Sequence, residues 1–241
     1  MTMNPKSNNL LTDHLYDRTC RLIGADALER IRKASVLVAG LGGVGGYIVE
    51  NLVRAGVGTI GLCDYDRIEA SNFNRQILAT AETDGMAKTA AAVRRCRSVN
   101  PDVRLNAHDI KINEKTIEEL NVDAYDCIAD AIDDVPAKIL LIQTAVMHGR
   151  RIVSAMGCGA KMDPFRFRIA PIEESHTCPL AKAVRKELRT LGISGVPVLF
   201  SDEKPGEAGR VDGCGATPSI SYMPAIAGSM IAGQILLDLI G

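Results

Sequence analysis

Polar residues suited to handling phosphates gather in short stretches of the first half of the chain. Asp64 and Asp66 follow an apolar run, and the stretch "SNFNRQIL" comes soon after them. Lys88 then stands near the start of a helical pattern. An arginine fork and a lysine point charge brought together suit a triphosphate. The stretch supplies Asn72, Arg75 and Gln76.

A glycine loop precedes these residues. "GLGGVG" follows an apolar run and satisfies G-x-G-x-x-G with Gly40, Gly42 and Gly45. In this fingerprint the first glycine permits a tight turn, the second lets phosphate approach, and the third lets helix and strand pack closely. The following helix N-terminus faces the phosphates, and Asp64 is placed to accept hydrogen bonds from ribose hydroxyls. NAD and ATP both fit this pattern.

Two further carboxylates follow another apolar run. "ADAIDD" places Asp130 and Asp133 where a strand of the predicted sheet ends, and ligands of open α/β folds bind at that edge. Mg²⁺ keeps most of its waters and takes only one or two carboxylates. Asp133 and Asp130 are therefore both candidates to bind Mg²⁺. Helix capping by either aspartate is the alternative.

The elements that position these residues alternate between strands and helices. Strands are expected at "SVLVAG", "TIGLCD", "VRLNAH", "YDCIAD" and "RIVSAM", and helices over 43–54, 85–98 and 135–148, with a short one near 116. This order is typical of a doubly wound, mostly parallel α/β sheet.

The pattern changes after residue 156. "FRFRIA" alternates and predicts an antiparallel strand, and an amphipathic helix is expected over 178–192. The prediction is one domain over 1–241, with a nucleotide-binding half over about 15–156 and a C-terminal half over about 157–241. The glycine-rich and charged segment 201–215 is expected to be a mobile loop.

The charge balance and the cysteine spacing argue against several classes of protein. Lys and Arg number 28 against 29 Asp and Glu, so nucleic-acid binding would need a local basic surface. The seven cysteines form no C-x-x-C pair, which argues against a disulfide framework or a zinc knuckle.

Neither end of the chain predicts targeting to a membrane. The start of the chain lacks the features of a signal peptide, so we expect a cytoplasmic protein. The apolar run over 222–237 is shorter than the roughly 20 residues of a membrane span, and Pro224 interrupts it. A buried helix is favoured over membrane association.

The ordered motifs "GLGGVGG", "NFNRQ" and "AIDD", with Asp64, Asp66 and Lys88 between them, resemble the ThiF/MoeB/HesA superfamily, which includes ubiquitin-activating enzymes. The resemblance implies an enzyme that adenylates carboxylates with ATP and Mg²⁺. It implies that the phosphates, ribose and metal are held by Gly42, Gly43, Gly45, Asp64, Asp66, Asn72, Arg75, Gln76, Lys88 and Asp133.

An arginine ahead of the first strand reaches into the partner's active site in that superfamily. Arg18 stands in the matching position, six residues before Gly24. The resemblance thus implies a homodimer and a catalytic set of Arg18, Arg75, Lys88 and Asp133. The alternative is that Arg18 belongs to a solvated N-terminal helix.

The C-terminal half resembles one branch of the superfamily, the tRNA threonylcarbamoyladenosine dehydratases. "DPFRF" and "CPLAKAVRKELRTLG" carry the likeness, although Cys178 stands where that branch usually has aspartate. The resemblance implies that tRNA is the partner, modified next to the anticodon. A basic surface that would suit tRNA phosphates is expected from Arg166, Arg168, Lys182, Arg185, Lys186 and Arg189.

Two alternatives stay open. The first is an adenylyltransferase for a ubiquitin-like sulfur-carrier protein, with a sulfur-relay protein as a further partner. The second is an NAD-binding oxidoreductase, in which Arg75, Lys88 and Asp133 would have no evident task.

Overall fold

The structure is a computed structural model that describes residues 14–204 and 217–241. Its centre is a seven-stranded sheet in the order β3-β2-β1-β4-β5-β7-β6. All neighbouring strands are parallel except β6 and β7, which pair antiparallel. The prediction of a doubly wound, mostly parallel sheet with an antiparallel C-terminal addition is confirmed. The strands are β1 Ser35–Ala39, β2 Thr59–Cys63, β3 Arg104–His108, β4 Cys127–Asp130, β5 Arg151–Ala155, β6 Phe167–Pro171 and β7 Pro197–Ser201.

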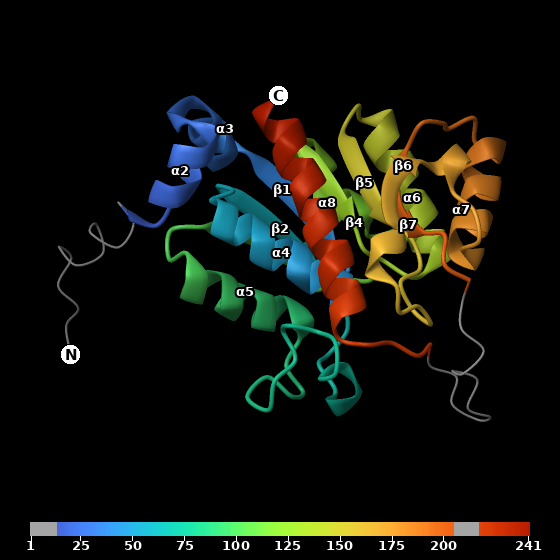
Figure 1. Cartoon of the computed structure of the whole chain (residues 1–241), viewed down its shortest axis with the longest axis horizontal. Coiled ribbons are helices and arrows are strands. Elements are labelled where there is room, and N and C mark those ends of the chain that lie inside the picture. The colour runs from blue at the N-terminus through green and yellow to red at the C-terminus, as the bar shows by residue number, and fades with distance from the viewer. Residues whose placement is uncertain (1–13, 205–216) are drawn as a thin grey trace.

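Helices cover both faces of the sheet (Figure 1). Side chains alternate along each strand, so Val36 and Val38 pack with α4 and α8, whereas Leu37 packs with α6 on the other face. The α-helices are α2 Asp17–Ile23, α3 Ala25–Lys33, α4 Gly43–Ala55, α5 Lys88–Val99, α6 Val135–Met147, α7 Pro179–Thr190 and α8 Tyr222–Ile240. Short 3₁₀ turns are η1 Ala70–Asn72, η2 Ile117–Leu120, η3 Val122–Ala124, η4 Pro164–Arg166 and η5 Ile172–Glu174.

Two predicted elements begin later than expected. Helix α5 starts at Lys88 instead of near residue 85, because Gly85 adopts φ +74° and Ala87 forms a β-bridge with Arg67. The antiparallel strand starts at Phe167, because the residues before it form η4. Both shifts move a helix or strand terminus without changing the topology.

The C-terminal half contains a strand that the sequence did not reveal. Strand β7 is almost wholly buried between β5 and β6. The prediction of a loop over 201–215 was wrong at its start, because Ser201 ends β7 and Asp202 and Glu203 bind neighbouring loops. The part of that prediction over 205–216 lies outside the described residues.

Helix α8 is the apolar C-terminal segment. Its 19 residues, with a mean hydropathy of 1.6 in the most apolar window, could cross a membrane by length and composition alone. In this structure α8 lies against α4 (Figure 1), and Met223, Ile231 and Ile235 are fully buried in the core. The helix therefore covers the sheet, as expected from its sequence.

A buried ion pair joins the middle of the sheet to α6. Lys138 is fully buried, and its Nζ lies 2.7 Å from Oδ2 of Asp130 at the end of β4. The same ammonium donates to Ser154 Oγ at 3.1 Å and to the Ala155 carbonyl at 3.0 Å, both on β5. Because the three protons of the ammonium have three acceptors, the charge is compensated.

Replacing Lys138 with methionine should destabilise the fold strongly. The substitution keeps the apolar stem but leaves the Asp130 carboxylate buried without its cation, which typically costs about 3–5 kcal/mol. Urea denaturation of Lys138→Met would measure the loss, with the exposed Lys115→Met as a matched control. Restoration of most of the stability by Asp130→Asn in the same chain is expected. A single variant as stable as wild type would contradict this assignment.

Candidate active site

A cavity of about 870 Å³ lies at the carboxyl edge of the sheet. Segments that follow β1, β2, β4 and β5 form its walls, together with residues from the start of α5 and α7. Of the expected site residues, the cavity lining includes Gly42, Gly43, Asp64, Asp66, Asn72, Arg75, Gln76, Lys88 and Asp133. Residues distant in sequence thus meet in one space, as parallel strands require.

The glycine loop can adopt its conformation only because glycine has no side chain. Gly40 adopts φ +85°, a conformation that L side chains rarely take. A Cβ on Gly45 would lie 1.7 Å from the Gly40 carbonyl oxygen, so the first turn of α4 can close against β1 only with glycine there. Gly42 faces open space in the cavity, with the Gln76 amide as the nearest contact. The loop therefore presents bare backbone to the cavity at the N-terminus of α4.

Asp64 fastens the glycine loop to the end of β2. Its Oδ2 accepts a hydrogen bond from the Leu41 amide at 2.6 Å, and its Oδ1 accepts one from the Asp66 amide at 2.8 Å. Each oxygen keeps a further lone pair, so the carboxylate can still accept from a ribose hydroxyl.

Lys88 brings a buried cation to the same corner. Its Nζ lies 2.8 Å from Oδ2 of Asp66 and 3.9 Å from Oδ2 of Asp64, and the residue is 6% exposed. The ammonium has hydrogen bonds left to donate, and its carboxylate partner Asp66 is exposed. An incoming phosphate would thus meet a cation that is already held in place.

The stretch after β2 folds over the glycine loop. Asn72 accepts from the Glu69 amide and closes η1, whereas the Arg75 guanidinium donates to the Ser71 carbonyl and to Asn74. Gln76 is buried, and among the described residues its Oε1 has no hydrogen-bond partner. The Gln76 Nε2 is the side-chain atom nearest to Gly42, so the amide already presents NH₂ to a phosphate bound at the glycine loop.

The two aspartates after β4 have different environments. Asp133 is exposed, lines the cavity and makes no side-chain hydrogen bond within residues 14–204 and 217–241. Asp130 is fully buried and does not line the cavity; its carboxylate is bound by Lys138, Ser154 and the Ile132 amide. The expectation of Asp130 as a second metal ligand was therefore wrong, and Asp133 fits Mg²⁺ as a single carboxylate.

Two of the thiols that line the cavity, Cys63 and Cys158, are poor nucleophiles. Burial, with the nearby charges of Asp64 and Asp109, raises the pKa of Cys63 to about 12. Burial likewise raises the pKa of Cys158 to about 12. Both thiols stay protonated near neutral pH, so no thiolate chemistry follows from them.

Several residues that line the cavity were not predicted from the sequence. Ile110 and Ile112 form an apolar wall beyond β3, and Lys111 between them lies 5.4 Å from the centre of the Tyr65 ring. Lys161 follows β5 and is only 4% exposed. The rule that ligands bind beyond the carboxyl ends of strands could have drawn attention to these segments.

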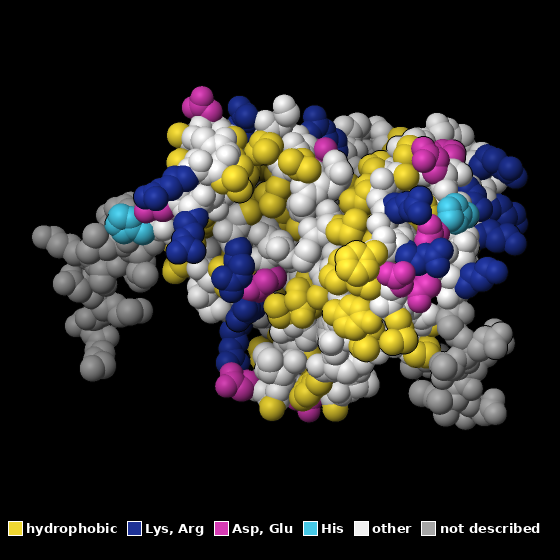
Figure 2. Space-filling view, in the orientation of Figure 1, with side chains coloured by type: hydrophobic (Ala, Val, Ile, Leu, Met, Phe, Trp, Pro, Cys, Tyr) yellow, Lys and Arg dark blue, Asp and Glu magenta, His cyan; other side chains and the backbone are white. Residues whose placement is uncertain are grey.

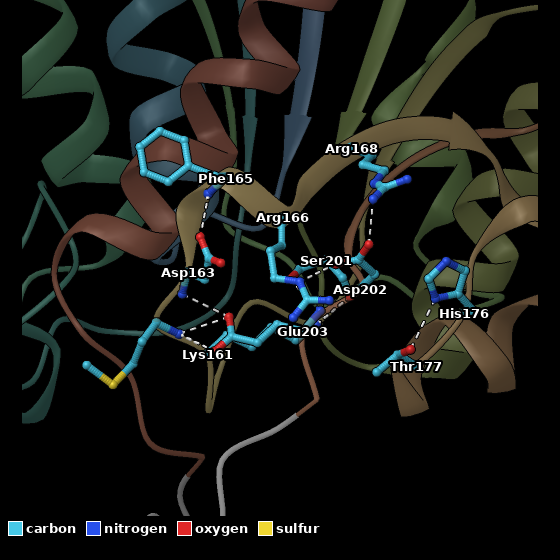
Figure 3. A network of polar contacts seen from close by, with 11 residues as sticks. Lys161, Asp163, Phe165, Arg166, Arg168, His176, Thr177, Ser201, Asp202 and Glu203 are labelled. Carbon is cyan, nitrogen blue, oxygen red and sulfur yellow. Dashed lines mark hydrogen bonds and ion pairs between the residues drawn. The ribbon is translucent and has the colours of Figure 1, made fainter.

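Two predicted basic features lie away from the cavity. Arg18 lies on α2, near the edge of the molecule (Figure 1), and does not line its own chain's cavity. Figure 3 shows Arg166 and Arg168 both directed at Asp202, to which each donates. Arg185 donates to the carbonyl and hydroxyl oxygens of Ser175.

The basic surface is therefore smaller than expected. Lys182, Lys186 and Arg189 are exposed on α7 and are its available cations. Figure 2 shows Lys and Arg side chains gathered at this end of the molecule.

Comparison with known proteins identifies the family. The family model of the ThiF family matches residues 16–241. The chain belongs to the ThiF family. It is 34% identical over 241 residues to the tRNA threonylcarbamoyladenosine dehydratase of Bacillus subtilis, covering 94% of this chain and 95% of that protein.

Two further relatives bear on the site. The crystal structure of the E. coli tRNA N6-threonylcarbamoyladenosine dehydratase in complex with ATP superposes with a TM-score of 0.87 at 27% identity, covering 99% of this chain and 97% of that one. The sulfur carrier protein adenylyltransferase of Thermus thermophilus is 31% identical, covering 91% of this chain and 74% of that protein.

Proposed function

We propose that this ThiF-family enzyme uses ATP to adenylate the carboxylate of threonylcarbamoyladenosine in tRNA, next to the anticodon, and then closes that side chain into a ring. The observation that carries the proposal is the convergence of Arg75, Lys88 and Asp133 on a glycine cradle in one cavity. The near-complete coverage of the Bacillus subtilis dehydratase supports the choice of substrate.

The strand order suggests how the substrates divide the cavity. Ile110 and Ile112 beyond β3 offer an apolar wall for adenine, and Asp64 after β2 offers acceptors for ribose. The glycine loop after β1 would hold phosphates, with Asp133 after the neighbouring β4. The loop after β5 comes next in this order and is left for the acyl substrate.

The charged residues would stabilise the phosphates while negative charge shifts toward the departing pyrophosphate. Lys88 and Arg75 supply cations that the fold already positions, so little reorganisation is needed during the reaction. Asp133 would hold Mg²⁺, which supplies further positive charge to the phosphates. The exposed, unpaired state of Asp133 in the described chain supports this role.

The chemistry follows from carboxylate activation. The threonyl carboxylate attacks the α-phosphorus of ATP and displaces pyrophosphate. An atom of the ureido group in the same side chain then attacks the activated carbonyl and expels AMP. Such intramolecular attack needs mainly positioning, since effective molarities reach about 10⁵ M or more.

The surface beside the cavity suits RNA. The α7 cations Lys182, Lys186 and Arg189 are exposed, and α7 begins at cavity-lining residues. Phosphate contacts from such a patch give salt-dependent binding without requiring a basic protein overall. A tRNA substrate also supports a cytoplasmic location.

A homodimer would explain the N-terminal helix. Helix α2 has seven residues and none of them is buried, and Leu22 on it is 83% exposed. Isolated helices of this length are marginal in water, so α2 is expected to pack on another surface. A second copy of the chain would supply that surface and would receive Arg18 in its active site.

The second candidate is an adenylyltransferase for a sulfur-carrier protein. The likeness to the Thermus thermophilus adenylyltransferase favours it, although that protein is covered to 74%. Under this alternative a small carrier protein, and a sulfur-relay protein after it, would replace tRNA as partners.

Calorimetry should distinguish ATP from NAD. We expect wild-type protein to bind ATP with a strong Mg²⁺ dependence and NAD weakly or not at all.

Kinetic measurements should show the contribution of the two charged residues to catalysis. Lys88→Ala and Asp133→Ala should each lower turnover about 10²- to 10³-fold, because each removes one preorganised electrostatic contact. Tight NAD binding without metal, unchanged by Lys88→Ala, would contradict the adenylation proposal.

Nucleoside analysis tests the proposed substrate. Tenfold or greater loss of cyclic threonylcarbamoyladenosine is expected in tRNA from a deletion strain, with the linear form accumulating. Purified protein should exchange pyrophosphate into ATP when tRNA carrying the linear form is added, but not with unmodified tRNA as the matched control. Exchange stimulated only by a ubiquitin-like carrier protein would support the second candidate instead.

Mixed dimers test the role of Arg18. Arg18→Ala and Lys88→Ala proteins should each have strongly reduced activity, whereas their hybrid contains one site with both residues intact. Mixing the two variants should therefore restore part of the activity. The control, Arg18→Ala protein alone at the same total concentration, should show no such recovery. Hybrids shown to form by two different affinity tags but lacking activity would rule out a contribution from the partner.

A further inference from the structure

Lys161 is a cavity cation to which the adenylation proposal assigns no role. Lys161 lies in the segment after β5 that also contributes Gly157, Cys158 and Ala160 to the cavity wall. The phosphate-handling residues follow β1, β2 and β4, so Lys161 lies toward the β7 side of the cavity. This is the side that the proposed function leaves for the acyl substrate.

The environment of Lys161 is unusual for a lysine. The residue is 4% exposed, and within the described chain its Nζ donates one hydrogen bond, to the Ser201 carbonyl at 2.8 Å. Lys138, which is fully buried beneath the same sheet edge, has a carboxylate and two further acceptors. Among the described residues, the Lys161 ammonium therefore has fewer acceptors to compensate its burial than the ammonium of Lys138 has.

The charged and polar groups near Lys161 do not cancel the effect of burial on the pKa of its amine. Burial lowers the pKa of the Lys161 amine, against weaker opposing contributions from Cys178, Cys158, Glu203 and Asp202. Glu203 is engaged elsewhere, since its carboxylate accepts from the amides of Met162 and Asp163. Asp202 pairs with Arg166 and Arg168.

The end of β7 holds this lysine in place. Ser201 binds its Nζ, and Glu203 binds the two backbone amides that follow it. Figure 3 shows Lys161 beside Ser201 and Glu203 in this network. The amine is thus fixed at the cavity wall by a rigid support, as a group that must meet a reacting atom requires.

Ring closure needs a group that accepts a proton. Attack by the ureido oxygen or by its distal nitrogen on the activated carbonyl forms a five-membered ring, and either route releases one N–H proton. The carbon–oxygen bond to the phosphate breaks as the new bond forms, and AMP leaves. The Cys158 thiol, with a pKa raised to about 12, is not a base near neutrality.

We propose that Lys161 is the general base of the cyclisation step. In its unprotonated form the amine takes the ureido proton as the ring closes, becomes an ammonium, and returns the proton to solvent after AMP leaves. This inference rests on the proposed function, because it requires an acyl-adenylate in the cavity.

The test separates the two half-reactions. Lys161→Met should keep tRNA-dependent pyrophosphate exchange within about threefold of wild type, while single-turnover ring formation falls about 10²-fold or more, the usual range for a general base. The acyl-adenylate should accumulate and be trapped by hydroxylamine as a hydroxamate. Lys115→Met, at an exposed site away from the cavity, is the matched control and should change neither rate.

Amine rescue distinguishes a base from a structural lysine. In Lys161→Ala, methylamine should restore ring formation in proportion to the free-base concentration, with no effect on exchange. Equal loss of exchange and ring formation in Lys161→Met, or unchanged ring formation, would overturn the proposal. Absence of exchange in the wild-type protein would instead refute the proposed function itself.

Discussion

The buried ion pair between Asp130 and Lys138 fixes the sheet edge on which the active site is built. It joins the last residue of β4 to β5 and to α6 in the middle of the sheet. Two charges removed from water are tolerated only with near-complete compensation, and here every ammonium proton has an acceptor. The turn bearing Asp133 leaves from this point, and so does the loop that leads from β5 to Lys161. The buried ion pair thus lies directly beneath Asp133 and Lys161, two residues with proposed roles in the reaction.

The parallel sheet determines the order in which the segments that line the cavity follow one another along its edge. Parallel strands bring their carboxyl ends to one edge, so the order of strands becomes an order of functions along the cavity. Asp64, the proposed acceptor for ribose, follows β2, the glycine loop follows β1, Asp133, the proposed Mg²⁺ ligand, follows β4, and Lys161 follows β5.

Much of this arrangement could be predicted from the sequence, and the failures have physical causes. The first five strands are apolar runs separated by glycine and helical patterns, and the glycine loop and the "NFNRQ" stretch lie where the spacing placed them. Strand β7 was not predicted because its five residues, PVLFS, form an apolar run too short to show a period and lead directly into a charged segment. Asp130 was misassigned because spacing identifies the edge of the sheet and not which side chain turns into the core. Lys138 was missed because a lysine within a helical pattern is usually solvated, and only the packing of α6 on β4 reveals that it is buried.

Isotope transfer tests whether the substrate carboxylate attacks the α-phosphorus of ATP. Threonylcarbamoyladenosine carrying a heavy oxygen isotope in both carboxylate oxygens would be supplied in tRNA, and the nucleotide products would be analysed by mass spectrometry. Attack by a carboxylate oxygen on the α-phosphorus should place one heavy oxygen in AMP and leave the other in the ring carbonyl. Unlabelled AMP, or heavy oxygen in inorganic phosphate released with ADP, would contradict this mechanism.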